Sequence, residues 1–367
     1  MTVGVLGGGQ LGRMLALAGY PLGLRFRFLD PSAHAPAGHV APLMVGDFED
    51  SDTLADFAEG LALATYEFEN VPATTAEFLA QRLPLYPPPA ALSVSQERLA
   101  EKEFFTSLGV PTAPFVPVNQ PEELPLAVEK IGLPAVLKTR RQGYDGKGQM
   151  ILRSSVDLTH AWDKLGGVPL ILEGFVSFDR ELSLVAARSK NRQMAFYPLV
   201  ENHHREGILR VTHAPAPDLT PQLQHLAEEY ARTILAALNY VGVLAIEFFQ
   251  VEDKLLANEM APRVHNSGHW SIEGAATSQF AQHLRAVVGL PLGSTETRGQ
   301  SAMINLIGKV PSSSELLALP GAHLHLYGKT PRPGRKLGHV TLCYPERAVL
   351  QDRMAEVWRI LGECGER

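Results

Sequence analysis

A lysine followed closely by a glycine-rich loop is the first feature of this sequence that could do chemistry. Lys138 ends the apolar run that begins at Val136, and the loop follows a few residues later. Its members are Gly143, Tyr144, Asp145, Gly146, Lys147, Gly148 and Gln149. Glycines let the backbone approach a ligand, while amide N–H and ammonium groups hold negative oxygens. The pattern indicates a strand leading into a loop that covers the phosphates of a nucleotide such as ATP, although a Gly/Asp loop is also typical of a plain hairpin turn.

Two glutamates further along the chain are candidate ligands of a divalent cation. The apolar stretches on either side of Asp253 read as the two strands of a hairpin. If the hairpin is centred on Asp253, Glu247 and Glu259 face each other, and facing like charges are destabilising unless a cation compensates them. With the amide of Asn258 beside them, these oxygens suit Mg²⁺. The alternative is a solvated hairpin edge, and a register shift of one residue would separate the pair.

A polar segment, residues 260–270, follows the second glutamate directly. It is dense in side chains that hold anions or donate hydrogen bonds, so Arg263, His265 and Asn266 are candidates for contact with an anion or a substrate. Capping of the next helix is the alternative. His265 and His269 have the spacing of a helical metal pair, but the Ser-Gly pair between them favours a loop and no H-E-x-x-H motif is present, which disfavours zinc.

Four positive charges gather near the C-terminus of a chain that is acidic overall. They fall within eight residues and are Lys329, Arg332, Arg335 and Lys336. Interspersed Pro and Gly residues indicate a shaped turn, and the forked guanidinium of arginine matches a phosphate monoester. The segment therefore reads either as a phosphate anchor or as a solvated loop.

A second glycine-rich loop lies at the N-terminus. Residues 7–12 satisfy G-x-G-x-x-G directly after an apolar strand, and Asp30 follows where a ribose-binding acid would lie. A dinucleotide such as NAD or FAD, another phosphate-bearing ligand, or a structural turn are all consistent with this loop. Hydride transfer, however, leaves no role for the other loop, the paired glutamates and the basic cluster, whereas ATP-driven ligation uses all three.

The composition is that of an ordinary globular protein. The chain has 367 residues, of which 45% are hydrophobic and 20% charged, so two or three domains are expected. A net charge of -6 argues against nucleic acid as a partner. Cys343 and Cys364 lack zinc or disulfide spacing, which fits a reducing compartment. No secretory signal and no membrane-spanning run is evident, so we expect a cytoplasmic protein without a membrane partner.

The elements that must position these residues follow from the hydrophobic pattern. Strands are expected at 3–6, 25–29, 44–45 and 63–66. Their alternation with helical stretches indicates an α/β domain with a doubly wound parallel sheet, ended near residue 90 by the proline run at 86–89. Beyond it the pattern predicts an α+β body with a helix at 95–108, strands at 170–173 and 181–185, and a helix at 221–238. A strand at 302–307 and a helix at 352–361 are expected last.

Taken in order, these motifs resemble the nucleotide site of the ATP-grasp superfamily. The residues that carry this resemblance are Lys138, 143–149, Glu173, Gly174, Phe175, Val176, Glu181, Glu247, Asn258 and Glu259. Further stretches are similar to the N5-carboxyaminoimidazole ribonucleotide synthetase family of purine biosynthesis, and they lie at 7–12, 66–71, 143–146, 201–208, 265–269 and 335–339. Leu337 stands where that family often has Met or Val, a departure that removes no polar group.

The resemblance implies three domains and one reaction. The domains would be a Rossmann-like pre-ATP-grasp domain at 1–90, an ATP-grasp body at 91–295 with a lid at about 112–178, and a small β-rich subdomain at 296–367. ATP and bicarbonate would give carboxyphosphate and ADP, and the exocyclic amine of 5-aminoimidazole ribonucleotide would then take up the carboxyl group. ATP, Mg²⁺ and a homodimer are implied as well.

By the same resemblance the site residues divide by task. Nucleotide contacts are implied for Arg98, Lys138, Gly143 to Gln149, Glu173, Gly174, Phe175, Val176, Glu181, His204, Asn258 and Glu259. The metal would lie on Glu247 and Glu259. Carboxyphosphate chemistry would involve Tyr144, Asp145, Arg263, His265 and Asn266. The substrate ribose and phosphate would be held by Gln10, Leu11, Glu69, Lys329, Arg335 and Lys336.

Three alternative functions stay open on the sequence. The closest is a formate-dependent glycinamide ribonucleotide transformylase, because that enzyme shares the superfamily, the domain order and a similar phosphate anchor. From different classes, an NAD-binding dehydrogenase or a non-catalytic nucleotide sensor could be built on residues 7–12.

Overall fold

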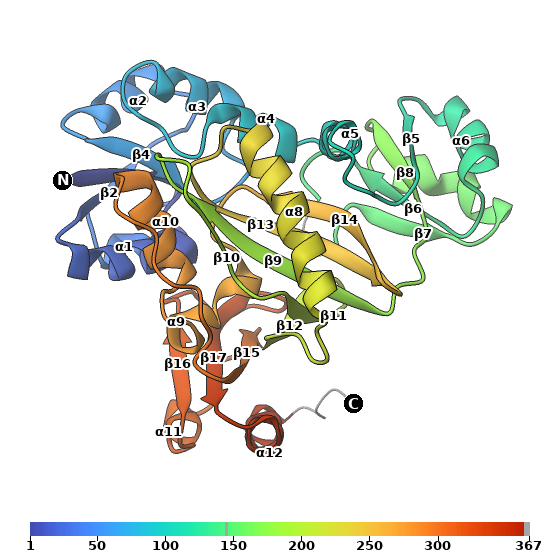
Figure 1. Cartoon of the computed structure of the whole chain (residues 1–367). Coiled ribbons are helices and arrows are strands. Elements are labelled where there is room, and N and C mark those ends of the chain that lie inside the picture. The colour runs from blue at the N-terminus through green and yellow to red at the C-terminus, as the bar shows by residue number, and fades with distance from the viewer. Residues whose placement is uncertain (144–145, 363–367) are drawn as a thin grey trace.

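A parallel sheet with helices on both faces forms the N-terminal part of the chain (Figure 1). The structure is a computed structural model that describes residues 1–143 and 146–362. The strands are β1 (Thr2–Leu6), β2 (Arg25–Asp30), β3 (Leu43–Val45) and β4 (Leu63–Tyr66), paired in the order β3-β2-β1-β4. The accompanying helices are α1 (Gln10–Gly19), η1 (Tyr20–Leu22), η2 (Pro36–His39), α2 (Ser51–Ala58) and α3 (Ala73–Ala80).

Both faces of this sheet are buried, as in other parallel sheets. Val3 and Val5 belong to the core that contains Leu15 of α1, whereas Leu6 belongs to a second core with Phe57 of α2. The strands expected at the N-terminus and the doubly wound parallel sheet are therefore confirmed.

A nine-stranded antiparallel sheet forms the centre of the molecule. Its strands are β9 (Arg180–Arg188), β10 (Met194–Phe196), β11 (Val200–Arg205), β12 (Ile208–Ala214), β13 (Gly242–Val251), β14 (Lys254–Ala261), β15 (Gln300–Ile307), β16 (Ala322–Leu326) and β17 (Lys336–Tyr344). The order is β14-β13-β9-β11-β12-β15-β17-β16, with β10 beside β9. Helix α8 (Pro221–Ala237) crosses one face in Figure 1, and α10 (Gln279–Val288) packs between this sheet and α1. Two short turns, η5 (Asn266–Gly268) and α9 (Ser271–Gly274), precede α10.

A smaller antiparallel sheet makes the separate lobe beside β14 in Figure 1. Its elements are β5 (Phe115–Val118), η3 (Pro121–Glu123), α6 (Leu124–Ile131), β6 (Ala135–Thr139), β7 (Gln149–Leu152), η4 (Ser155–His160), α7 (Ala161–Lys164) and β8 (Leu170–Gly174). The strands pair in the order β5-β8-β6-β7. The glycine-rich loop thus connects β6 to β7, and Lys138 lies near the end of β6 as expected.

The helix expected at 95–108 is confirmed as α5 (Arg98–Ser107), which starts three residues later and ends one residue earlier than expected. A separate short helix, α4 (Pro89–Ser95), precedes it. Glu97 between them has an extended backbone and accepts hydrogen bonds from the amides of Leu99 and Ala100, so it starts a new helix as an N-cap. Arg98 therefore lies in the first turn of α5.

The C-terminal strands extend the central sheet through the pairing of β12 with β15. Two helices, α11 (Ser313–Leu317) and α12 (Arg347–Leu361), cover them and share a core with Ile304 and Val340. This region therefore has its own core but shares its sheet with the body, and the domain boundaries proposed from the sequence stay a prediction. Helix α12 starts earlier than residue 352. None of the helices in the described ranges is long and apolar enough to cross a membrane.

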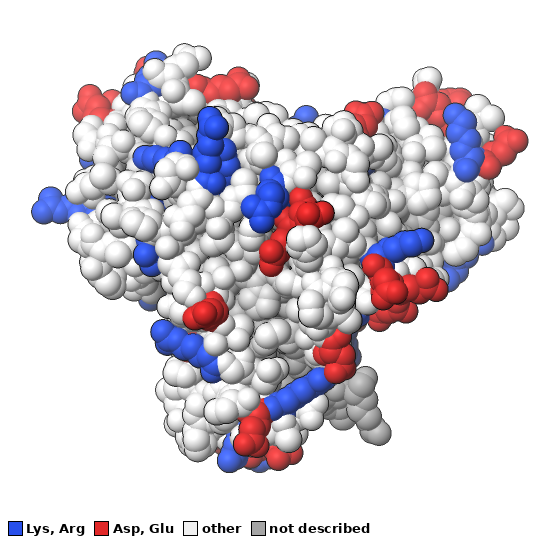
Figure 2. Space-filling view, in the orientation of Figure 1, with Lys and Arg blue, Asp and Glu red and all other residues white. Residues whose placement is uncertain are grey.

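Charged side chains are dispersed on the face of the molecule shown in Figure 2. Acidic and basic residues alternate there among uncharged ones, and the described residues of this face show no patch of a single sign.

Candidate active site

Two adjoining clefts meet at the hairpin of β13 and β14. The first cleft has a volume of about 320 Å³ and lies between the small sheet and the central sheet. The second cleft, of about 540 Å³, lies between the N-terminal sheet, α5 and the loop that contains Lys329. Both are lined by Arg98, Glu247, Glu259, His265, Asn266 and Lys336. Molecules bound in the two clefts would therefore share this wall.

The two candidate metal carboxylates are cross-strand partners, as the sequence predicted. Next to the turn the strands pair from Val251 opposite Lys254, and a β-bulge after Glu247 places it opposite Glu259. Asn258 is the extra residue of the bulge. Its side-chain Oδ1 is buried and has no hydrogen-bond partner among the described residues. The side chains of Glu247, Glu259 and Asn258 therefore bring oxygen atoms to one place. No hydrogen bond satisfies the amide oxygen of Asn258 among the described residues.

The surroundings shift the pKa values of the two glutamates in opposite directions. Burial and the facing Glu259 raise the pKa of Glu247 to about 7. Burial also acts to raise the pKa of Glu259, but Arg98 outweighs it and lowers that pKa, since Arg98 Nη1 lies 3.0 Å from Glu259 Oε2. Arg98 Nη2 also donates to the carbonyl of Gly143 at 3.3 Å, so one guanidinium links the candidate metal carboxylates to the glycine-rich loop.

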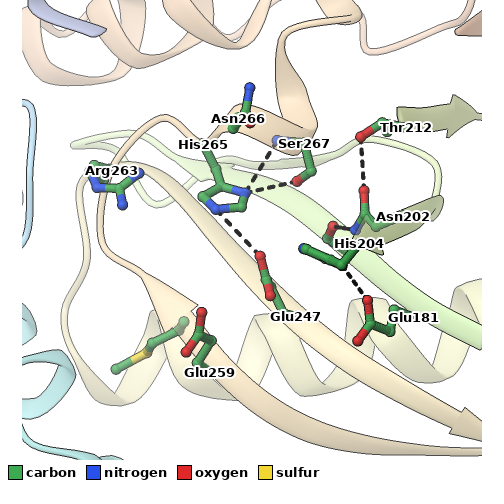
Figure 3. A network of polar contacts seen from close by, with 12 residues as sticks. Glu181, Asn202, His204, Thr212, Glu247, Glu259, Arg263, His265, Asn266 and Ser267 are labelled. Atoms are coloured by element: carbon green, nitrogen blue, oxygen red, sulfur yellow. Dashed lines mark hydrogen bonds and ion pairs between the residues drawn. The ribbon is translucent and has the colours of Figure 1, made fainter. Parts of the chain in front are cut away.

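His265 approaches Glu247 from the polar segment after β14 (Figure 3). Its Nε2 lies 3.3 Å from Glu247 Oε1, and its Nδ1 accepts from the amide of Ser267 at 3.3 Å. Burial and the neighbouring Arg263 lower the pKa of His265 to about 3, so the imidazole is neutral. Because Nδ1 accepts, the proton is on Nε2 and points to Glu247.

The remainder of the polar segment is held by amide contacts. Asn266 and Asn305 exchange two hydrogen bonds of 3.1 and 2.7 Å. His269 is fully buried and its Nδ1 contacts Gln279, whose side chain also bonds to the backbone of His265. The described residues contain no group of three or more His, Cys, Asp or Glu side chains arranged to hold a metal ion.

Lys138 lies in the first cleft and is paired with a buried carboxylate. Its Nζ is 2.9 Å from Glu173 Oε2, and Lys102 Nζ is 3.5 Å from the same oxygen. Burial acts to raise the pKa of Glu173, but the two lysines outweigh it and lower the pKa to about 2. The other carboxylate oxygen, Oε1, is buried and has no partner among the described residues, which leaves one acceptor in the cleft wall.

Most of the residues predicted to contact a nucleotide line the first cleft. They are Arg98, Lys138, Gly146, Lys147, Gln149, Glu173, Gly174, Phe175, Val176, Glu181, His204, Asn258 and Glu259. Glu181 contacts Nδ1 of His204, and this contact outweighs the effect of burial and raises the pKa of His204. Gly143 lines the second cleft instead, and Gly148 lines neither because it packs against Thr139 and Gly143. Tyr144 and Asp145 lie outside the described residues.

The second cleft contains every residue predicted to hold a substrate. Gln10, Leu11 and Glu69 come from the N-terminal domain, and Lys329, Arg335 and Lys336 come from the C-terminal loop. Arg263 and Glu69 form an ion pair across the cleft wall. Burial lowers the pKa of Lys329 to about 8, with Arg335 and Lys336 adding to the effect against the opposing influence of Glu67. A cluster of cations faces a cleft that opens to solvent.

Several residues at the clefts were not among the site residues predicted from the sequence. Phe178 and Phe249 line the first cleft as a stacked pair, with ring centroids 4.7 Å apart and planes 9° apart. Glu101 and Glu67 line the second cleft. Lys102 follows Arg98 by one helical turn, a spacing that could have indicated a second inward-facing cation. The two phenylalanines carried no such signal, because they are far apart in the sequence.

Family comparisons divide the chain into three matched segments. Residues 1–96 match the ribonucleotide synthetase preATP-grasp domain, and residues 103–280 match the ATP-grasp domain. Residues 301–353 match the phosphoribosylaminoimidazole carboxylase C-terminal domain. This order is the one implied by the motifs, and it confirms the fold class.

Individual proteins match over nearly the whole chain. An N5-carboxyaminoimidazole ribonucleotide synthase of Pseudomonas aeruginosa is 53% identical over 97% of this chain and 98% of its own. The crystal structure of an N5-carboxyaminoimidazole ribonucleotide synthetase from Thermus thermophilus is 60% identical and covers 100% of both chains with a TM-score of 0.96. The Aspergillus clavatus synthase in complex with ADP and 5-aminoimidazole ribonucleotide is 32% identical over 98% of this chain and 97% of its own, with a TM-score of 0.91.

Proposed function

Since the chain belongs to the N5-carboxyaminoimidazole ribonucleotide synthase family of ATP-grasp enzymes, we propose that it carboxylates 5-aminoimidazole ribonucleotide with ATP and bicarbonate. The observation that carries the proposal is the shared wall of the two clefts, formed by residues such as Glu247, Glu259 and His265. A nucleotide in the first cleft and a ribonucleotide in the second would meet there. This is the geometry required when one substrate activates a group for the other.

The reaction proceeds in two displacements. A bicarbonate oxygen attacks the γ-phosphorus of ATP, and the bond to ADP breaks. Bicarbonate is a poor electrophile, and phosphorylation supplies it with a leaving group. The carboxyl group then passes to the exocyclic amine, with loss of inorganic phosphate and of one amine proton. Because charge develops on the transferring phosphoryl group, positive groups aimed at it are the main catalytic need.

ATP would occupy the first cleft. The stacked Phe178 and Phe249 supply an apolar wall for the base, and the unpartnered Oε1 of Glu173 is an acceptor for the N–H groups of adenine. Lys138, held by Glu173, lies where the strand enters the glycine-rich loop. Lys147 in that loop adds a second cation to the cleft wall for the phosphates.

A magnesium ion fits the shared wall. The orphaned Oδ1 of Asn258 and the raised pKa of Glu247 both indicate that a positive charge is needed beside Glu259. Glu247, Glu259 and Asn258 would hold the ion, which would neutralise charge on the transferring phosphoryl group. Oxygen-only ligands of this kind suit Mg²⁺ better than zinc.

The residues around this wall would orient the small groups. Arg98 bridges Glu259 and the carbonyl of Gly143, so it ties the position of the phosphate loop to the metal carboxylates. Neutral His265 presents its Nε2 proton, and Arg263, fixed by Glu69, presents a cation near the same place. These groups would bind carboxyphosphate, with Asn266 as a further donor. Closure by Tyr144 and Asp145 stays a prediction.

The ribonucleotide would lie in the second cleft with its phosphate on Lys329, Arg335 and Lys336. The lowered pKa of Lys329 reflects the burial and like charge that a phosphate dianion would relieve. Gln10, Leu11 and Glu69 would contact the ribose from the opposite wall.

A product assay separates this proposal from the closest alternative. With ¹³C-bicarbonate, ATP and 5-aminoimidazole ribonucleotide, the protein should form a new carbamate signal by NMR. A formate-dependent transformylase would instead consume ATP with formate and glycinamide ribonucleotide. Turnover only with the second pair of substrates would overturn the proposal.

The homodimer follows from the family resemblance, the cytoplasmic location follows from the cysteine usage and the lack of a secretory signal, and both stay predictions. Sedimentation equilibrium on the full chain would test the first, with a mass of twice 40.0 kDa expected. Fractionation of cells that express the protein would test the second.

A further inference from the structure

The N-terminal glycine-rich loop already holds an anion, and that anion is a side chain of the protein. The amide of Gly9 donates to Glu67 Oε1 at 2.7 Å, and the amide of Gly12 donates to Glu67 Oε2 at 2.9 Å. Both amides belong to the start of α1, where the helix dipole and free N–H groups favour negative charge. In a dinucleotide-binding fold this is the position of the ligand pyrophosphate. Here the two oxygens of one carboxylate occupy it.

The two glycine amides before Gly9 are also engaged by groups of the protein. Gly8 donates to Asp30 Oδ2 at 2.8 Å, and the amide of Gly7 donates to the carbonyl of Leu29. The other oxygen of Asp30 accepts from Ser32, so the acid that resembled a ribose ligand is engaged as well. The amides of Gly7, Gly8, Gly9 and Gly12 are therefore engaged by the protein itself, which argues against NAD or FAD at this loop.

Position 9 must be glycine because Glu67 lies so close to it, and not because of its backbone conformation. Gly9 has φ −73° and ψ −166°, which any residue can adopt. A Cβ placed on Gly9 would, however, overlap Oε1 of Glu67. A Cβ placed on Gly7 would lie 2.6 Å from Cγ of Glu67. Gly7 also has a φ of 94°, so its own backbone requires glycine as well, whereas Gly9 is explained by the close approach of the Glu67 carboxylate alone.

Glu67 also reaches the second cleft. It is 7% exposed and lines that cleft together with Gln10 and Leu11, the two residues that follow Gly9 on α1. Lys329 on the opposite side interacts with its charge. Helix α1 has no acidic residue of its own in the first turn, so Glu67 supplies the only carboxylate that the described residues show at the amides of Gly9 and Gly12.

We propose that Glu67 is a positioning residue for the ribonucleotide site: its carboxylate replaces the ligand phosphate at the start of α1 and so fixes Gln10, Leu11 and Lys329 at the second cleft. The kinetic part of this proposal rests on the proposed function, whereas its structural part stands on the hydrogen bonds alone. Charge-assisted hydrogen bonds of this kind are the strong ones in proteins.

The structural part is tested by a double-mutant cycle on thermal stability. Gly9→Ala should lower the unfolding midpoint by about 5 °C in the wild-type background, because its Cβ would overlap Glu67. In the Glu67→Ala background the same change should cost little. Gly8→Ala is the matched control, since its Cβ would lie 2.7 Å from Ala35 instead, and its cost should be the same in both backgrounds. Equal costs of Gly9→Ala in both backgrounds would overturn the proposal.

The kinetic part is tested by comparing the KM values for the two substrates and by chemical rescue with acetate. Glu67→Ala should raise the KM for 5-aminoimidazole ribonucleotide about 10-fold and leave the KM for ATP unchanged. Acetate, which can enter the vacated position at the start of α1, should restore much of the loss in Glu67→Ala and have no effect on the wild type. Glu67→Asp serves as the conservative variant and Glu67→Ser as a second variant should Glu67→Ala not fold.

The outcomes separate the two proposals. If the wild type turns over its substrates, the proposed function stands. The role of Glu67 would still be overturned by equal increases of the KM values for ATP and the ribonucleotide. It would also be overturned if acetate rescued neither Glu67→Ala nor Glu67→Ser. If the wild-type protein does not use the ribonucleotide, the proposed function is contradicted. The double-mutant cycle on thermal stability would then be the test of Glu67 at the start of α1.

Discussion

Glu247 and Glu259 face each other across β13 and β14 because Asn258 is bulged out of the ladder between them. Without the bulge, the register set by the turn would pair Glu247 with Asn258, and Glu259 would point to the other side of the sheet. The bulge therefore brings two carboxylates together at a site where like charges repel. Such an arrangement costs stability in the absence of a cation, which fits a metal site shaped for function.

Replacing Glu247 by Gln should separate stability from activity. In metal-free buffer, Glu247→Gln should be as stable as the wild type or more stable by up to about 1 kcal/mol, because like charges no longer face each other. ADP formation should fall by roughly 100-fold or more, because a proposed ligand of the magnesium ion would be lost. Urea unfolding and a coupled ADP assay measure the two quantities. Exposed Glu252 is the control, and Glu252→Gln should change neither.

Arg98→Lys should weaken ATP binding more than a conservative change suggests. Lysine cannot reproduce the two contacts that Arg98 makes with Glu259 and with the carbonyl of Gly143. We expect the KM for ATP to rise roughly 10-fold. Initial-rate kinetics at saturating ribonucleotide would measure it, with Arg153→Lys on the exposed surface as the control. An unchanged KM would remove Arg98 from the nucleotide site.

The buried triad of Glu173, Lys102 and Lys138 should make stability depend on acid pH. The pKa of Glu173 is about 2 in the folded protein against an ordinary value of 4.5. A lowered pKa contributes stability that is present above about pH 4.5 and is lost as the pH falls towards 2. Glu173→Gln, which leaves two buried lysines unpaired, should lose roughly 3–5 kcal/mol at pH 7.

Urea unfolding at pH 7 and at pH 3.5 would test the triad. The stability gap between wild type and Glu173→Gln should narrow at the lower pH. The exposed Glu129→Gln provides the control. A gap of equal size at both pH values would show that the Glu173 charge is not responsible.

The kcat/KM for the ribonucleotide should decrease at basic pH because of Lys329. Burial lowers its pKa to about 8, so the ammonium loses its proton as the pH rises through 8, and a neutral amine binds phosphate poorly. The kcat/KM for the ribonucleotide should therefore fall above about pH 8. In Lys329→Ala it should be lower by roughly 10-fold or more at pH 7, and this decrease at basic pH should be absent. Lys309→Ala on the surface should behave as the wild type.

The parts of the fold with local signals were predictable. Strands β1 to β4 follow from apolar runs bounded by turn residues, and the two strands of the hairpin follow from the turn at Glu252 and Asp253. The pairing of Glu247 with Glu259 was also correct, but for an incomplete reason. The turn alone gives a register one residue different, and the bulge at Asn258, which no local pattern indicates, restores the predicted pair.

Contacts between distant segments were beyond the sequence pattern. The hydrogen bonds of Glu67 to Gly9 and Gly12 join residues 58 and 55 positions apart, so the glycine-rich loop read as a ligand site. The helix at 95–108 was predicted, but its start was placed at Ser95 and not at Arg98, because Glu97 acts as the N-cap, a role that Asp, Asn, Ser and Thr fill more often. In both places a glutamate binds backbone amides, which no local pattern indicates.

The most direct test of the proposed function is ADP release with each substrate omitted in turn. Purified protein is supplied with Mg-ATP and with bicarbonate, 5-aminoimidazole ribonucleotide, both or neither. ADP should rise above background only when both are present, because in the proposed mechanism the phosphorylation of bicarbonate and its capture would occur in clefts that share one wall. ADP release that is indifferent to both small substrates would contradict the account.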